Sequence, residues 1–437
     1  MKESGIEWIG LIPCEWGTIR MQDIAEYKKG PFGSAITIDM FVDKGENTYK
    51  VYEQKNAIQA DETLGWYYIE KNDYLNLKEF SLRPGDIIVS CAGTIGKCFV
   101  LPENIEEGII NQALMRVRTY SNIDKSFFIY LFTVALEYMN EKFSNGSAIK
   151  NIPPFSVLKK QKIAVPCKTE QKIIANFLDE RCMKIDDAIA DLEKQLKILT
   201  DYKTALINEC VTRGCSEIKL KDSGIKCIGK INSRWDVKRL KYLLATPLQY
   251  GANEAGDDYD ERNPRYIRIT DISENNFLKD DGKQSLEYSL AKPYLLNNGD
   301  VLFARSGATV GKTFYYTKDC GVAAFAGYLI RATTKSSILY SKFLYYITLS
   351  SYYESWKNTS FSMATIQNIG ADKYNDLPIV LPKLKEQIKI VDYLDEKVTL
   401  INEIINKKQL QLEKIKSNKS SLIYEYVTGK KRVKVGE

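Results

Sequence analysis

One stretch of the sequence constrains the fold more than any other, because its apolar residues recur at heptad spacing with no proline or glycine between them. This stretch covers residues 170–212. A helix of that length would be about 64 Å long, and its apolar seam must pack against a partner to leave water. The first seam position holds Leu178, Ile185, Leu192, Leu199 and Leu206, and the second holds Cys182, Ile189 and Leu196. A helical partner is therefore required.

The chain supplies that partner through an internal repeat. A second heptad stretch runs over residues 394–422, and Glu386 and Gln387 repeat Glu170 and Gln171 at an offset of 216 positions. An offset shared by unrelated residue types indicates an internal duplication. We therefore predict two long helices that pack against each other.

The segments outside the helices repeat as well. Residues 84–90 (Pro-Gly-Asp-Ile-Ile-Val-Ser) match residues 298–304 (Asn-Gly-Asp-Val-Leu-Phe-Ala), and each predicts a turn followed by a short buried strand. A glycine loop follows each of them, whereas residues 262–268 have no counterpart. The predicted segments of this α+β chain are a mixed domain at 1–165, a helix at 166–214, a second mixed domain at 215–380 and a helix at 381–437. Like scaffolds with unlike loops suit two domains that read different things.

Composition excludes several classes of protein. The chain of 437 residues has no histidine, which removes histidine-based acid–base catalysis and histidine-ligated metal sites. Its nine cysteines form no Cys-x-x-Cys pair, which argues against a zinc site and predicts free thiols in a reducing cytoplasm. No run approaches about 18 apolar residues, so we predict no membrane span, and the first residues do not form a signal peptide.

Charge is distributed unevenly. The net charge is +6, but residues 1–165 carry 19 Lys and Arg against 21 Asp and Glu, whereas residues 381–437 carry 13 against 8. Mild basicity permits nucleic-acid binding without requiring it. If DNA is the target, we expect a partner to supply part of the charge that neutralises phosphates.

Two motifs imitate enzyme signatures. Residues 306–313 look like a phosphate-binding loop, but three residues separate the two glycines where that loop needs four. We interpret the segment as a turn between strands that presents Arg305 and Lys312 to a phosphate of DNA. Residues 151–155 (Asn-Ile-Pro-Pro-Phe) imitate an adenine methyltransferase motif, but an isoleucine interrupts it and no glycine-rich cofactor loop accompanies it. We interpret that segment as a chain turn.

Several further motifs lie along the chain, the first of them in the first half only and most of the others repeated in the second half. They are Gly-Pro-Phe-Gly-Ser at 30–34, Gly-Asp-Ile-Ile at 85–88 with Gly-Asp-Val-Leu at 299–302, Gly-Thr-Ile-Gly-Lys at 93–97, and the Glu-Gln and Leu-Asp pairs within 170–179 and 386–395. With these motifs, the chain resembles the specificity subunit of type I restriction–modification systems over essentially its whole length. The resemblance implies two target recognition domains, each reading one half of a split, asymmetric DNA site. It also implies that the two helices pack as an antiparallel coiled coil about a pseudo-two-fold axis.

The same resemblance implies partners. The helices would fix the distance between half-sites on double-stranded DNA and dock two modification subunits that methylate adenine. ATP-driven restriction subunits would complete the nuclease. We therefore expect S-adenosylmethionine, ATP and Mg²⁺ in partner subunits, and neither cofactor, metal nor catalysis in this chain.

Candidate contact residues lie in loops or at the helix starts. The candidate DNA contacts, which have donors suited to bases or phosphates, are Ser34, Lys97, Tyr250, Arg265, Arg268, Arg305 and Lys312. The candidate docking residues are Glu170, Gln171, Glu386, Gln387 and Lys408. Three lysines, Lys203, Lys408 and Lys419, occupy heptad core positions, where they either extend from the seam to water or contact an acidic patch on a modification subunit.

Three other readings stay open from sequence alone. The chain could serve a related two-part nuclease–methylase system outside type I, which a neighbouring gene for an ATP-dependent motor would argue against. It could be a coiled-coil scaffold without a DNA role, which salt-dependent binding to duplex DNA beside a methyltransferase partner would argue against. It could also be an enzyme with an unrecognised site, although no activatable nucleophile or carboxylate pair supports that reading.

Overall fold

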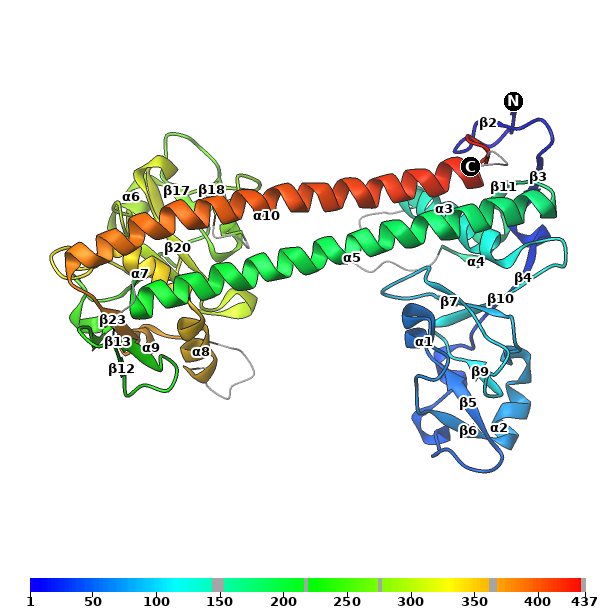
Figure 1. The fold of residues 1–437 in the computed structure, drawn as a ribbon, viewed down its shortest axis with the longest axis horizontal. Helices are drawn as coiled ribbons and strands as arrows, with labels where there is room; N and C mark the ends of the chain where they lie inside the picture. The colour runs from blue at the N-terminus through cyan, green and yellow to red at the C-terminus, as the bar shows by residue number, and fades with distance from the viewer. Residues whose placement is uncertain (144–152, 216–218, 274–276, 361–367, 434–437) are drawn as a thin grey trace. The chain divides into compact units, whose positions relative to one another are not determined.

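The computed structural model describes residues 1–143, 153–215, 219–273, 277–360 and 368–433. The chain divides into two compact units, Met1–Asp191 with Gln411–Glu437, and Leu192–Leu410 (Figure 1). Each unit contains one globular domain and one part of each of two long helices, α5 (Lys168–Arg213) and α10 (Leu384–Val427).

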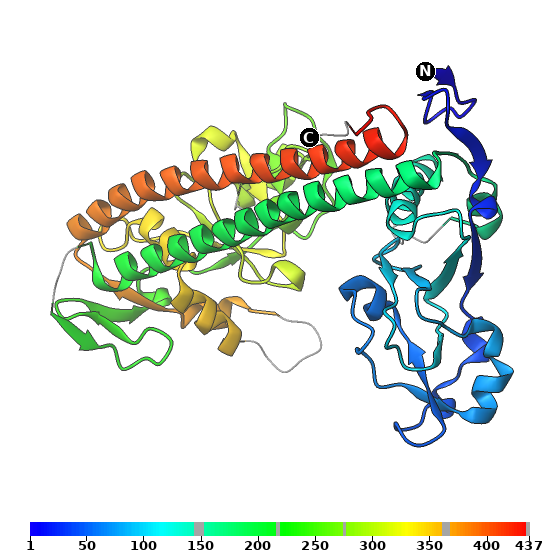
Figure 2. The same cartoon turned by 45° about the vertical axis from the view of Figure 1, so that its right-hand side comes forward.

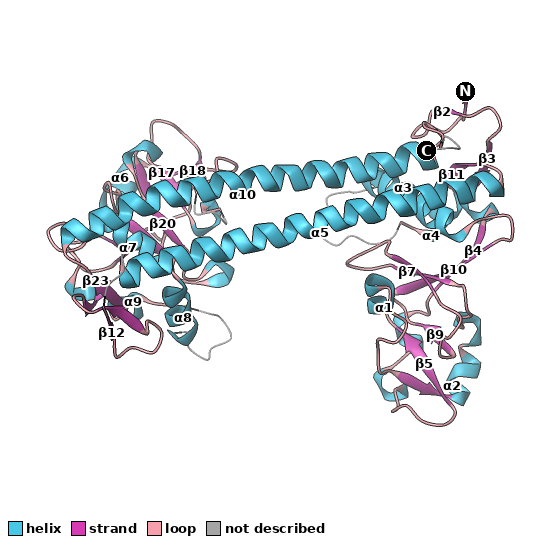
Figure 3. Cartoon of the chain, in the orientation of Figure 1, coloured by secondary structure: helices cyan, strands magenta, loops and turns pink. Residues whose placement is uncertain are grey.

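The first domain is built on an antiparallel sheet of four strands in the order β4-β10-β7-β8 (Figure 3). Its strands are β4 (Ala25–Lys29), β10 (Leu114–Thr119), β7 (Ile87–Ser90) and β8 (Cys98–Val100). A second sheet, in the order β6-β5-β9, pairs β5 with β9 in parallel. Its strands are β6 (Tyr68–Glu70), β5 (Thr48–Tyr52) and β9 (Gly108–Ile110). The remaining strands are β1 (Lys2–Glu3), β2 (Leu11–Ile12), β3 (Gly17–Arg20) and β11 (Lys162–Val165). The helices are α3 (Lys125–Phe143), which has 19 residues, and the short α1 (Gln54–Gln59), α2 (Lys71–Asn76) and α4 (Phe155–Lys160).

The second domain repeats this plan. Its antiparallel sheet has the order β15-β22-β19-β20, with β15 (Gln249–Tyr250), β22 (Leu329–Ala332), β19 (Val301–Ala304) and β20 (Thr313–Tyr315). Its other large sheet has the order β16-β18-β17-β21, with β16 (Asp257–Asp258), β18 (Gln284–Ser285), β17 (Arg265–Ile267) and β21 (Ala323–Phe325). The remaining elements are β12 (Leu220–Asp222), β13 (Lys230–Asn232), β14 (Asp236–Arg239), β23 (Pro378–Leu381), α6 (Tyr288–Ala291), α7 (Ser341–Thr348), α8 (Ser351–Ser360) and α9 (Ala371–Asn375). Here β17 and β21 are parallel, as β5 and β9 are in the first domain.

The repeated Gly-Asp motif has the same structural task in both domains. Asp86 accepts a hydrogen bond from the backbone of Arg83 at 2.9 Å, and Asp300 accepts one from the backbone of Asn297 at 2.8 Å. Each motif thereby closes a turn, and a strand that is buried at all four positions follows it. The predicted turn-and-strand units and the predicted duplication are confirmed.

Each long helix is anchored on a domain core at both of its ends. In the first unit, Phe128 and Phe132 of α3 share a core with Leu178 near the start of α5 and with Val427 at the end of α10. In the second unit, the core joins the end of α5 to the start of α10; its members include Ile207, Val211, Phe343, Ile347, Ile390 and Leu394. Burial of these apolar side chains ties each domain to the helices.

Within each unit the segments of α5 and α10 lie side by side and run antiparallel (Figures 1 and 2). In the first unit, the rings of Phe177 and Tyr426 are in tilted contact at 4.6 Å between centroids, and Lys419 pairs with Asp186 at 2.6 Å. In the second unit, Lys203 donates to Asn402 at 3.1 Å, and Lys408 donates to Gln195 at 2.5 Å. Partner numbers fall along one helix as they rise along the other, so the predicted antiparallel packing is confirmed.

Candidate nucleic-acid interface

A glycine ends the first strand of the main sheet in both domains and begins an exposed loop. Gly30 donates its backbone N–H to Leu114 at 2.9 Å, and Gly251 donates to Leu329 at 3.2 Å. A Cβ at Gly30 would overlap the Asn111 carbonyl oxygen, and one at Gly251 would overlap the carbonyl oxygens of Phe325 and Ala326. Only glycine fits so close to a neighbouring backbone, so both loops begin from the same fixed point.

These two loops, at residues 30–34 and 251–256, present different side chains. In the first, Pro31 is buried while Phe32 is 90% exposed and Ser34 is exposed. In the second, Asn253 occupies the position of Phe32 and is exposed. Phe32 and Asn253 were not among the sequence candidates, although their position two residues beyond the fixed glycine could have indicated them.

The second loop of the surface joins a central strand to an edge strand, β7 to β8 in the first domain and β19 to β20 in the second. Gly96 donates its backbone N–H to Ser90 at 2.8 Å, and Gly311 donates to Ala304 at 2.8 Å. The loop at 307–312 thus connects the antiparallel strands β19 and β20, which confirms its interpretation as a turn. Thr313, which a phosphate-binding loop would use for magnesium, is buried, and its hydroxyl lies 2.7 Å from that of Thr348.

The candidate lysines of these loops have different environments. Lys97 is exposed beyond β7, and its backbone N–H donates to the Ser90 hydroxyl at 2.9 Å. Lys312 is half-buried beside a cavity of about 280 Å³ that Glu354 and Lys357 also line. Both stay predicted DNA contacts. The imitation methyltransferase motif begins with Asn151 and Ile152, which lie outside the described residues.

Two of the three candidate arginines in the second domain form ion pairs and hydrogen bonds with residues of that domain. Arg268 bonds to Asp271 at 2.8 Å, to Gln284 at 2.7 Å and to the carbonyl of Gly282 at 2.8 Å. Arg265 pairs with Asp280 at 3.3 Å and also donates to the Lys279 carbonyl. These bonds occupy donors that direct base reading would need and give the two side chains a bracing role within the domain, and their DNA contact stays a prediction.

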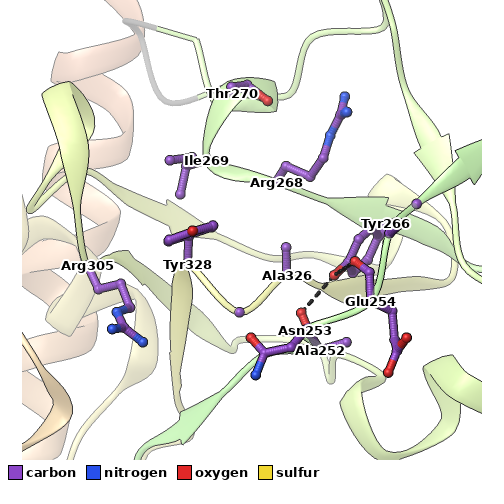
Figure 4. A pocket seen from close by; sticks show the side chains of 13 residues that line it. Ala252, Asn253, Glu254, Tyr266, Arg268, Ile269, Thr270, Arg305, Ala326 and Tyr328 are labelled. Atoms are coloured by element: carbon purple, nitrogen blue, oxygen red, sulfur yellow. Dashed lines mark hydrogen bonds between the residues drawn. The ribbon is translucent and has the colours of Figure 1, made fainter.

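Arg305 has a different environment. Its guanidinium lies over the ring of Tyr250 at 4.9 Å from the centroid, a cation–π contact. It lines a cavity of about 740 Å³ together with Asn253, Tyr328 and Arg268 (Figure 4). Tyr328, which the sequence analysis missed, is 61% exposed there. Two predicted contacts, Arg305 and Tyr250, therefore meet at one site.

Tyr266 braces the loop that borders this cavity. Its hydroxyl donates to the carbonyl of Ala252 at 2.7 Å and to that of Glu254 at 3.0 Å (Figure 4). Burial raises the pKa of Tyr266, so the phenol stays protonated and keeps donating at neutral pH. The loop is thus held at two backbone carbonyls that are two residues apart.

The two glutamines predicted to dock a partner are instead buried. Gln171 accepts from the backbone of Asp124 at 2.8 Å and donates to the Pro166 carbonyl at 2.9 Å. Gln387 makes the same pair of bonds, accepting from Tyr340 at 2.8 Å and donating to Pro382 at 2.9 Å. Since both amides bond inside the chain, their repetition has a structural reason, and docking by them stays a prediction.

The other docking candidates also have partners within their own unit. Glu170 pairs with Arg432 at 3.2 Å, and Glu386 accepts from the backbone of Lys383 at 3.1 Å. Lys408 and Lys419 make exposed bonds across the seam to Gln195 and Asp186, which agrees with long side chains that extend toward water, whereas Lys203 makes a part-buried bond to Asn402. Their docking roles stay predictions.

Metal-binding and membrane-spanning features were among the classes considered above. Among the residues that the structure describes, no group of three or more histidine, cysteine, aspartate or glutamate side chains is arranged to hold a metal ion. In the same part of the chain, no helix has the length and apolar character needed to cross a membrane.

Comparison with known proteins agrees with this geometry. The chain is 24% identical over 453 residues to the type I restriction enzyme MjaVIII specificity subunit of Methanocaldococcus jannaschii, covering 99% of this chain and 97% of that one. It is 28% identical over 278 residues to the StySPI specificity subunit of Salmonella potsdam, covering 62% and 58%. A solved chain described under "complex assembly and conformational transition of the type I R-M system" shares the fold, with a TM-score of 0.68, 13% identity and coverage of 95% and 98%.

The family model described as "Type I restriction modification DNA specificity domain" matches twice, at residues 13–199 and 232–414. Each match takes in one globular domain and part of a long helix. The chain therefore belongs to the family of type I restriction–modification DNA specificity subunits, with two copies of the family's domain.

Proposed function

We propose that each globular domain reads one half of a bipartite, asymmetric DNA site, using the loops at the fixed-glycine end of its main sheet. The observation that carries the proposal is the pairing of like backbones with unlike side chains at equivalent positions: Phe32 in one domain and Asn253 in the other. Backbone contacts position a protein on DNA, whereas side chains in the grooves specify sequence.

The two long helices would fix the gap between half-sites and dock two modification subunits. Support comes from their unbroken length of 46 and 44 residues and from an apolar stripe on α10 that the seam does not use. The stripe consists of Tyr393, Leu400 and Ile404, which are exposed and fall on one face at spacings of seven and four. Exposed apolar residues grouped on a helix suit a protein interface.

Chemistry would reside in the partners. S-adenosylmethionine would bind to the modification subunits, ATP and Mg²⁺ to the restriction subunits, and the whole would assemble in the cytoplasm. This chain would contribute recognition alone. Its modest net charge of +6 agrees with partners that supply much of the phosphate neutralisation.

The test is the adenine methylation pattern of cells that express this chain with its cognate modification subunit. The expected result is a two-part motif with a constant gap, absent when this chain is deleted. Methylation without such a motif, from a partner shown to be bound to this chain, would contradict the proposal. Binding of the assembled complex to duplex DNA would then show whether the chain is an inactive reader or a scaffold.

A further inference from the structure

Arg305 differs from the other arginines around the second domain's reading loops because its guanidinium is not paired with a carboxylate of the described residues. Arg262 and Arg265 are paired with Asp260 and Asp280, and Arg268 with Asp271. No carboxylate or carbonyl of the described residues bonds to the Arg305 guanidinium, and its Nε is buried without a partner. A cation held in this way has lost water on one side and gained no acceptor, which favours a ligand that supplies one.

The backbone holds Arg305 in a fixed place at the end of β19. Its N–H donates to the Tyr328 carbonyl at 3.0 Å, and its carbonyl accepts from Ile369 at 2.8 Å. The side chain lies over Tyr250, whose hydroxyl in turn accepts from the backbone N–H of Ala371 at 2.9 Å. Ring and guanidinium are thus both positioned before any ligand binds, which lowers the entropy lost on recognition.

The surroundings suit a base better than a bare phosphate. Because Nε is buried, the two terminal nitrogens of the guanidinium are the donors left for a ligand. Arg305 and Asn253 line the same cavity of about 740 Å³, beside the exposed ring of Tyr328 (Figure 4). A planar fork, an amide and an aromatic ring together match the flat, polar edge of a base, whereas a phosphate requires only charge.

We propose that Arg305 reads a guanine in the second half-site, with its two terminal nitrogens donating to O6 and N7, and that Tyr250 is the residue that positions it. The inference rests on the proposed function and adds the base that is recognised. The equivalent position in the first domain is Cys91, whose N–H donates to Ala113 at 2.9 Å as that of Arg305 donates to Tyr328. The first half-site is therefore read without this contact.

The experiment measures methylation rates by the assembled complex on duplexes that carry each base pair in turn at every position of the second half-site. Four variants are compared with the wild-type chain: Arg305→Ala, Arg305→Lys, Tyr250→Ala and Tyr250→Phe. Arg262→Ala is the matched control, because it removes the same charge from a side chain that is 89% exposed and paired with Asp260. Recognition of the first half-site reports on assembly and folding in every variant.

We expect Arg305→Ala to lose about 10- to 100-fold of the preference for guanine at one position, with the first half-site and the gap unchanged. Arg305→Lys should bind DNA nearly normally but discriminate less, because an ammonium lacks the fork. Tyr250→Ala should weaken the same preference, Tyr250→Phe should restore it, and Arg262→Ala should match wild type.

Two results would overturn the inference. In one, Arg305→Ala slows methylation equally on all duplexes and Arg305→Lys restores the rate, which identifies a phosphate contact. In the other, the position that loses its base preference does not carry a guanine, or no position loses its preference. Either result leaves the two-part motif of the wild-type chain standing, whereas loss of the proposed function would show as the absence of that motif in the wild type.

Discussion

The reading surfaces of the two globular domains share a backbone and differ in nearly every side chain that faces outward. Matching backbone hydrogen bonds show which positions of the two domains are equivalent. The backbone N–H groups of Cys91 and Arg305 each donate to the carbonyl of the residue before the adjacent strand. Glu53 and Arg268 each donate to a side chain three residues on. The pairs, first domain before second, are Phe32 and Asn253, Glu53 and Arg268, Cys91 and Arg305, and Ala113 and Tyr328.

The difference between the surfaces is chemical. The first presents the apolar ring of Phe32, while the second presents the amide of Asn253, the phenol of Tyr328 and the guanidinium of Arg305. The glycines and turn aspartates have the same structural role in both domains, and under the proposed function the differing loop side chains do the reading.

The largest expected effect tests the shared part of the fold. Gln171→Ala and Gln387→Ala should each lower the free energy of unfolding by about 2–4 kcal/mol, because each leaves several buried backbone groups without a partner. Urea unfolding of the full chain, followed by circular dichroism, gives the measurement. Unchanged stability with lost binding of the modification subunit would instead restore a docking role for the glutamines.

The fixed glycines should behave alike in the two domains. Gly30→Ala and Gly251→Ala should each cost about 1–3 kcal/mol and abolish reading of their own half-site, because the added Cβ overlaps a backbone carbonyl. Gly33→Ala is the control, since a Cβ there meets nothing within 4 Å. Sequencing of methylated adenines reports the reading. Normal reading by Gly30→Ala would show that the loop does not depend on this close approach.

The apolar stripe distinguishes the long helices, because the positions 216 residues earlier, Phe177, Lys184 and Ala188, do not repeat it. Leu400→Glu combined with Ile404→Glu should weaken binding of a modification subunit by at least about 10-fold, since charges replace apolar contacts. Asn406→Glu, exposed on another face, is the control. Analytical ultracentrifugation of the mixed subunits would measure the loss of binding. Normal assembly by the double variant would exclude the stripe as a docking surface.

The smallest effect concerns the lysines in the seam. Burial lowers the pKa of Lys203, which means that the folded state disfavours its charge, whereas Lys419 is compensated by Asp186. Lys203→Met should raise the free energy of unfolding by about 1 kcal/mol, and Lys419→Met should not. Because the folded pKa of Lys203 lies below the unfolded one, wild type gains stability as pH rises into the alkaline range, and the advantage of Lys203→Met should shrink there. A constant difference from pH 7 to 10 would contradict this account.

The architecture could be predicted well, because a heptad seam and a constant offset of 216 residues are patterns that can be read directly from the sequence and that have a physical cause. The functional residues were harder to predict from the sequence than the architecture. A repeat marks every residue that both halves need, whether for folding or for binding, so the sequence could not show that the amides of Gln171 and Gln387 also bond inside the chain. Sequence shows that Arg268 has donors, but only the folded structure shows that Gly282 and Gln284, distant in sequence, occupy them together with Asp271.

The measurement that tests the central comparison most directly is the methylation motif of Phe32→Ala set beside that of Asn253→Ala. These residues occupy one structural position in two domains. We predict that Phe32→Ala changes recognition in the first half-site only and Asn253→Ala in the second only, with the gap constant in both. A variant that altered both halves, or that left both halves as in wild type, would contradict the assignment of one half-site to each domain through this loop.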